Sequence, residues 1–138
     1  MRLKLILPST FLLAMAALPA AAQDYLAFRS PSGNIVCAIW TGEWAGVRCD
    51  MTELTPSYRR RPADCDLEWG SSFEVDARGP GYLACVGDSV FDPGAFVLGY
   101  GKSVSLGALT CTSKKSGMTC TNGQGHGFSI AKAKQRVF

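Results

Sequence analysis

Gly33-Asn34-Ile35-Val36-Cys37 has a glycine and then an aliphatic residue two positions before a cysteine, a pattern repeated in Gly81-Tyr82-Leu83-Ala84-Cys85 and Gly107-Ala108-Leu109-Thr110-Cys111. Shortened versions occur in Gly46-Val47-Arg48-Cys49 and Gly117-Met118-Thr119-Cys120. Residues two apart on a β-strand point to the same face, so each pattern predicts a turn glycine leading into a strand whose apolar residue and cysteine face inward. The repeated pattern therefore predicts a cross-linked β scaffold.

The rest of the chain has the same character. Gly, Pro, Ser and Asn recur about every eight to twelve residues, and the short segments between them are rich in Val, Ile, Thr, Phe and Tyr. No stretch longer than about ten residues has clean helical periodicity. We predict an all-β fold, a small disulfide-stapled sandwich or barrel of consecutive β-hairpins. The predicted strands are 25–28, 35–40, 47–51, 72–76, 82–86, 95–98, 103–106, 109–112, 118–121 and 127–130.

The first 22 residues are typical of a secretory signal peptide. Arg2 and Lys4 precede an apolar run over residues 5–18, and Ala20-Ala21-Ala22 supplies small residues before a cleavage site. A membrane anchor is the alternative, but the run is shorter than the roughly 20 residues that a spanning helix needs. We predict cleavage before Gln23, a single domain over residues 23–138, no membrane anchor after cleavage, and a periplasmic or secreted protein.

Charge argues against one class of partner. The whole chain carries 14 basic and 11 acidic side chains. Removal of Arg2 and Lys4 leaves 12 basic against 11 acidic, a net charge of +1. Nucleic-acid binding proteins concentrate positive charge, so we expect no nucleic-acid partner.

All six cysteines follow the predicted cleavage site, and exported chains keep disulfides. The polar stretch 114–117 is centred between Cys111 and Cys120 and ends in glycine, as a short hairpin loop requires, so these two are predicted to pair. Cys37 and Cys49 flank residues 41–46 in the same way. Cys65 and Cys85 then pair by elimination, with the turn signal off centre, so this bridge is expected to tie a loop to a strand.

The predicted hairpins over 33–49 and 107–120 share this pattern of glycine, aliphatic residue and cysteine. They are either a duplicated unit or two disulfide-linked hairpins that converged on the same pattern. The spacing favours neither alternative.

Further motifs fall in a fixed order along the chain: Ser30-Pro31-Ser32-Gly33-Asn34, Arg48-Cys49-Asp50, Cys65-x-x-x-Trp69-Gly70, Cys85-x-Gly87-Asp88-Ser89, Tyr100-Gly101, Cys120-x-Asn122 and Gly125-His126-Gly127-Phe128. With these motifs the chain resembles a family of small secreted bacterial proteins with six cysteines, known as a domain of unknown function. The resemblance implies an exported, disulfide-bonded domain, and it implies no activity and no site residues.

The only histidine, His126, is the first candidate for chemistry. A hydrolase would use it as a general base, oriented by Asp88 and acting with the hydroxyl of Ser89. Alternatively, Gly-His-Gly is a turn whose imidazole satisfies backbone groups, and one histidine does not define a triad. We favour the turn.

A metal site has less support. Asp64, Asp66 and Glu68 alternate, but the spacing lacks the glycine and the terminal glutamate of an EF-hand loop. A solvated acidic loop explains the spacing better. We expect no metal and no cofactor.

Trp44 lies at the predicted tip of the hairpin between Cys37 and Cys49. An exposed aromatic residue on a cross-linked loop would be a preorganised anchor for a protein groove or a sugar face. In the plainer interpretation, which we favour for this side chain, Trp44 folds back onto the sheet beside Trp40. Trp69 is expected in the core.

Two groups of cations complete the candidates. Lys132, Lys134 and Arg136 alternate, which predicts three cations on one strand face, either to meet anionic envelope polymers or to protect an edge strand from pairing. Edge protection is the simpler explanation. Residues 59–61, three arginines between two prolines, are expected in an exposed loop.

These observations favour binding over catalysis. We expect an exported, monomeric, non-enzymatic module of the bacterial cell envelope that presents rigid disulfide-linked loops, with Trp44 at one tip, to an envelope or host protein or to a glycan. The alternative function is a small secreted hydrolase that uses His126 with Asp88.

Overall fold

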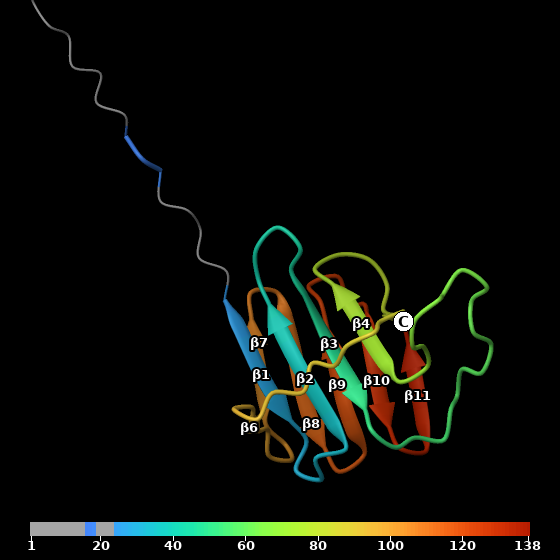
Figure 1. Cartoon of the computed structure of the whole chain (residues 1–138). Coiled ribbons are helices and arrows are strands. Elements are labelled where there is room, and N and C mark those ends of the chain that lie inside the picture. The colour runs from blue at the N-terminus through green and yellow to red at the C-terminus, as the bar shows by residue number, and fades with distance from the viewer. Residues whose placement is uncertain (1–15, 19–23) are drawn as a thin grey trace, which may run out of the picture.

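A computed structural model describes residues 16–18 and 24–138 (Figure 1). The predicted signal peptide and its cleavage site lie outside the described residues, apart from residues 16–18, which form no helix or strand. The described residues contain no helix, and thus none able to span a membrane. The strands are β1 (Tyr25–Arg29), β2 (Ile35–Trp40), β3 (Gly46–Met51), β4 (Ser72–Asp76), β5 (Tyr82–Leu83), β6 (Phe96–Val97), β7 (Ser103–Leu106), β8 (Leu109–Lys114), β9 (Gly117–Thr121), β10 (Gly127–Ala131) and β11 (Lys134–Val137).

The strands form two sheets, which Figure 1 shows stacked face to face. The first sheet has the order β5-β4-β3-β2-β1-β6, and the second has the order β11-β10-β9-β8-β7. Neighbouring strands are antiparallel except for β1 and β6, which run parallel. The predicted all-β fold of consecutive hairpins is confirmed, and it is a sandwich.

The core lies between the sheets. Strand residues at every second position are fully buried there, as the pattern of glycine, aliphatic residue and cysteine predicted. Phe73 of the first sheet packs against Phe128 of the second, with ring centroids 6.3 Å apart. The Sγ atoms of Cys49 and Cys120 are 3.8 Å apart, so the two hairpin disulfides touch at the centre of the core.

All three predicted disulfides are present. Cys37–Cys49 and Cys111–Cys120 each join directly paired residues of neighbouring strands, with Cα atoms 4.1 Å apart. Cys65–Cys85 is the third bridge. The expectation that it ties a loop to a strand was wrong, because β5 ends at Leu83 and Cys85 already belongs to the segment that leaves the sheet. Three disulfides indicate an oxidising, extracytoplasmic environment.

Residues 84–95 form a crossing segment that runs from β5 over the outer face of the first sheet to β6. Figure 1 shows it passing in front of β3 and β2. This route explains why β5 is shorter than the predicted strand 82–86. It also buries the outward-facing residues of the middle strands, so β3 is buried along both faces.

Strand β11 was missing from the list of predicted strands, although the alternation of Lys132, Lys134 and Arg136 predicted a strand face there. It forms one edge of the second sheet, and its exposed residues include Lys134 and Arg136. Lys132 lies in the preceding turn, so the prediction that three cations share one strand face was wrong for that residue. The edge is also covered by hydrogen bonds, since Ser57 Oγ accepts from Gln135 N (2.9 Å) and Tyr58 Oη accepts from Val137 N (3.0 Å).

Candidate binding surface at the Trp44 end

Trp44 is 81% exposed, the largest exposed aromatic surface among the described residues of the domain. It lies in the loop 41–45 between β2 and β3. The alternative in which Trp44 folds back was wrong, because Trp40 takes that place: its ring covers Gly46, where an added Cβ would lie 2.9 Å from Cζ2 of Trp40. The indole of Trp40 also donates a hydrogen bond to the carbonyl oxygen of Trp44. Trp40 therefore fixes the loop while the side chain of Trp44 stays free.

The loop is held on both sides by the neighbouring strands. On one side, Thr41 N donates to Asp24 O (3.0 Å) and Asp24 N donates to Thr41 Oγ1 (2.9 Å). On the other side, Ala77 N donates to Ala45 O (2.9 Å). The Cys37–Cys49 disulfide joins the two strands that carry the loop. A tip held in this way loses little conformational freedom on binding.

Aromatic residues continue from this loop across the outer face of the first sheet. The strand register places Tyr25, Trp40, Gly46 and Asp76 opposite one another in one row. Tyr25 is 57% exposed, and Tyr82, from β5, donates a hydrogen bond to Asp76 Oδ1 (3.1 Å). We call Tyr25, Trp40, Trp44 and Tyr82 the aromatic surface.

Carboxylates lie beside the aromatic surface. Glu74 is half-buried and pairs with Tyr82 in the register of β4 and β5. Burial of its side chain raises the pKa of Glu74, and the nearby Asp76 adds to the shift. Burial and the same two carboxylates raise the pKa of the Tyr82 phenol, which stays protonated and able to donate. The surface thus combines aromatic faces with hydrogen-bond acceptors.

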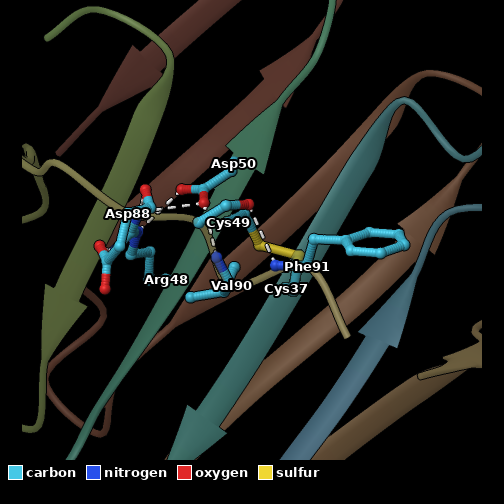
Figure 2. Close-up of polar contacts among 8 residues, drawn as sticks. Cys37, Arg48, Cys49, Asp50, Asp88, Val90 and Phe91 are labelled. Carbon is cyan, nitrogen blue, oxygen red and sulfur yellow. Dashed lines mark hydrogen bonds and ion pairs between the residues drawn. A yellow bond between two sulfur atoms is a disulfide. The ribbon is translucent and has the colours of Figure 1, made fainter. Parts of the chain in front are cut away.

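A buried ion pair supports this face from β3. Figure 2 shows Arg48 with Asp50, from the same strand, and Asp88, from the crossing segment. Arg48 donates to both carboxylate oxygens of Asp50 (Nε to Oδ1 2.8 Å, Nη2 to Oδ2 3.0 Å) and to Asp88 Oδ1 (2.9 Å). Val90 N also donates to Asp50 Oδ2 (2.9 Å). The network therefore fastens the crossing segment onto the sheet.

This network determines the charge state of Asp88. Burial of Arg48 opposes its charge, but its hydrogen bonds with Asp50 and Asp88 outweigh burial and raise its pKa. The hydrogen bond from Arg48 in turn lowers the pKa of Asp88. The carboxylate of Asp88 stays ionised, with one oxygen bound to Arg48.

His126 does not join the other two candidates for hydrolysis, Asp88 and Ser89, in one site. Among the described residues, no hydrogen bond or ion pair joins His126 to Asp88 or Ser89. His126 is partly buried in the β9–β10 loop, where its backbone N donates to Asn122 Oδ1 (3.1 Å). Asp88 and Ser89 line a cleft of about 350 Å³ that His126 does not line. Ser89 Oγ accepts from Phe91 N (3.1 Å) within the crossing segment.

The remaining candidates lie elsewhere on the surface. Asp64, Asp66 and Glu68 are exposed, and no group of three or more His, Cys, Asp or Glu in the described part of the chain is arranged to hold a metal ion. Arg136 lies over the ring of Phe138, 4.4 Å from its centroid. Lys134 is exposed on β11, and Lys132 pairs with Glu53 at the end of the sandwich opposite Trp44.

Fold and surface together define a class: a two-sheet β domain joined by three disulfides, with an exposed aromatic hairpin tip. The chain belongs to a family of unknown function, DUF6636, whose model matches residues 7–138. This family membership confirms the resemblance seen in the sequence. Neither the curated proteins nor the solved structures contain a match to the chain.

Proposed function

We propose that this protein is an exported, non-enzymatic binding module of the bacterial cell envelope, released into the periplasm or beyond by cleavage before Gln23. The observation that carries the proposal is Trp44, 81% exposed on a loop that a disulfide and four hydrogen bonds hold in place. Large aromatic side chains in rigid positions supply much of the affinity of binding sites. In this proposal the protein acts as a monomer.

A glycan is the partner that the aromatic surface favours. The C–H face of a pyranose ring packs on an indole or phenol ring. Its hydroxyls can donate to the carboxylate oxygens of Glu74 and Asp76, and one of them can accept from a tyrosine. A protein loop is the other possible partner, since exposed aromatic residues also anchor protein interfaces.

Calorimetric titration of the oxidised protein with soluble fragments of peptidoglycan tests the proposal. We expect saturable binding and a loss of at least about tenfold in affinity for Trp44→Ala, about 1.4 kcal/mol, as for a modest hot spot. Leu67→Ala is the matched control, because Leu67 is a 52% exposed apolar side chain outside the aromatic surface. Equal losses in the two variants would overturn the role of Trp44.

Absence of glycan binding would shift the proposal to a protein partner. In that case, a photo-crosslinker placed at position 44 should join the protein to an envelope protein, and one placed at position 67 should not. Crosslinking from neither position, together with no glycan binding, would overturn the proposal.

A further inference from the structure

A second cleft, of about 560 Å³, lies at the end of the sandwich opposite Trp44. Three turns meet there: residues 30–34 between β1 and β2, 115–116 between β8 and β9, and 132–133 between β10 and β11. Three lysines line the cleft: Lys114, Lys115 and Lys132. Glu53 is the only acidic residue that lines it. The cleft is therefore a local concentration of positive charge in a chain whose formal net charge is only +3.

Two of these lysines are free to bind a ligand. Within the residues that the structure describes, Lys114 and Lys115 have no ion-pair partner, and both are exposed. Lys132 Nζ holds Glu53 Oε2 at 2.9 Å. This exposed pair lowers the pKa of Glu53, and it places a carboxylate in the cleft where an anionic group of a ligand could bind. Exposed pairs of this kind are weak and exchange partners readily.

The walls of the cleft are preorganised. Asn34 Nδ2 donates to Glu53 O (2.9 Å), and Glu53 N donates to Asn34 Oδ1 (2.8 Å), which joins the first turn to the segment after β3. Thr55 N donates to Lys132 O (2.7 Å), which joins that segment to the third turn. Gly117 brings the lysine turn against β10, where a Cβ would lie 2.2 Å from Ile130 O.

The remaining lining residues suit a saccharide. Ser32 supplies a hydroxyl and the half-exposed Tyr100 supplies an aromatic face. A simple inorganic anion would leave most of a 560 Å³ cleft empty. We propose that this cleft binds an acidic saccharide unit, with the anionic group between Lys114, Lys115 and Lys132 and the sugar ring against Tyr100. This site is separate from the aromatic surface and does not rest on the function proposed for it.

The test uses oligogalacturonate, whose acidic group is a carboxylate, a heparin oligosaccharide, whose acidic groups are mainly sulfates, and neutral dextran. Calorimetry should show binding of at least one acidic oligosaccharide and none of dextran, with affinity that falls as NaCl is raised. Preference for oligogalacturonate assigns a carboxylate ligand, and preference for heparin assigns a sulfate ligand. Failure of both to bind would overturn the site.

Variants test whether the acidic saccharide binds in this cleft, and two of them should change the affinity in opposite directions. Lys114→Gln/Lys115→Gln should weaken it by about tenfold, as expected for the loss of two exposed charge contacts of about 0.7 kcal/mol each. Glu53→Gln should strengthen it, because it frees Lys132 and removes the competing carboxylate. Lys134→Gln is the matched control, because Lys134 is an exposed lysine of β11 outside the cleft. A loss for Lys134→Gln equal to that of the double variant, or weaker binding by Glu53→Gln, would overturn the site.

Trp44→Ala separates this inference from the proposed function. It should leave acidic-saccharide binding unchanged while it weakens binding of the partner at the aromatic surface. If Trp44→Ala weakens both, the acidic saccharide binds at the aromatic surface and the cleft proposal is wrong.

Discussion

Hairpin β2–β3 ends in Trp44, whereas hairpin β8–β9 ends in Lys114 and Lys115 at the opposite end of the sandwich. The two hairpins share the same pattern of glycine, aliphatic residue and cysteine, and each has a disulfide between directly paired residues. Their disulfides touch in the core. One scaffold thus presents two different surfaces, one suited to apolar contact and the other to charge.

The ends also differ in how they are held. The loop of Trp44 is tied to its neighbours mainly through backbone groups, so its side chain is left free. The lysine cleft is tied by the side chain of Asn34, together with the carbonyl oxygen of Lys132, which accepts from Thr55 N. Only the first hairpin has a crossing segment over its outer face, fastened by Arg48. Substitutions should therefore affect the two ends unequally.

The largest expected effect comes from Arg48→Met. This substitution should destabilise hairpin β2–β3 and leave hairpin β8–β9, which has no such ion pair, largely unaffected. It leaves Asp50 buried without its cation, a loss of about 3 to 5 kcal/mol in the free energy of unfolding. Urea unfolding measures the loss, and hydrogen exchange should show faster opening at β3 than at β8. The control is Arg48→Met/Asp50→Leu, which leaves no unpaired charge and should recover much of the stability. A double variant less stable than the single one would contradict the account of the buried pair.

Removal of a hairpin disulfide comes next. Cys37→Ala/Cys49→Ala and Cys111→Ala/Cys120→Ala remove bridges that close loops of 12 and 9 residues, so each should cost about 3 kcal/mol, nearly the same for both. The measurement is the urea midpoint with the m-value checked for constancy. Because the two bridges touch, the quadruple variant should depart from the sum of the two losses. Strict additivity would show that the hairpins are independent units.

The sequence was informative about the hairpins because each needs only local signals. A turn glycine, a short polar loop and two inward cysteines predict both a strand pair and its bridge, and both hairpin bridges were confirmed. The third pairing, Cys65–Cys85, followed by elimination and was also confirmed. The path after Cys85 was not predictable in this way. Its direction is decided by contacts 40 residues apart in sequence, between Arg48 and Asp88 and between Asp50 and Val90.

The two proposed binding surfaces could not be predicted from local signals alone, because their residues are brought together only by the order and register of the strands. Tyr25, Trp40 and Tyr82 come from three strands, and only the order of the first sheet brings them onto one face. The alternation Arg48-x-Asp50 did carry a usable signal, since it places opposite charges on the same strand face. Lys114 and Lys115 read as ordinary hairpin-loop residues until three separate turns were seen to meet at one cleft.

Smaller losses of stability are expected when the hydrogen bonds that hold each end of the sandwich are removed. Asn34→Ala removes two hydrogen bonds with the backbone of Glu53 and should cost about 1 to 2 kcal/mol. Thr41→Val removes one, at the Trp44 end, and should cost about 1 kcal/mol. Thermal unfolding at fixed pH measures both. Asn34→Ala should also weaken acidic-saccharide binding, which Thr41→Val should leave unchanged, and the reverse result would contradict the proposed division of the two ends.

The smallest effect is a pH dependence of opposite sign at the two ends. The pKa of Glu74 is raised by burial, so above its ordinary value of 4.5 the folded protein binds more protons than the unfolded chain, and stability falls as pH rises toward the folded pKa. Glu74→Gln should therefore be more stable than the wild type at pH 7, by less than about 1 kcal/mol because the side chain is partly solvated.

Glu53 behaves in the other direction. Lys132 lowers its pKa, so its contribution is present above the ordinary value of 4.5 and is lost as pH falls through the folded pKa. Glu53→Gln should be slightly less stable than the wild type at pH 7 and equal to it at pH 3, whereas Glu74→Gln should converge on the wild type below pH 4.5. Melting temperatures at pH 3, 5 and 7 test both variants. Shifts of the same sign would contradict one of the two accounts: burial of Glu74 if both variants are less stable at pH 7, and the pairing of Glu53 with Lys132 if both are more stable.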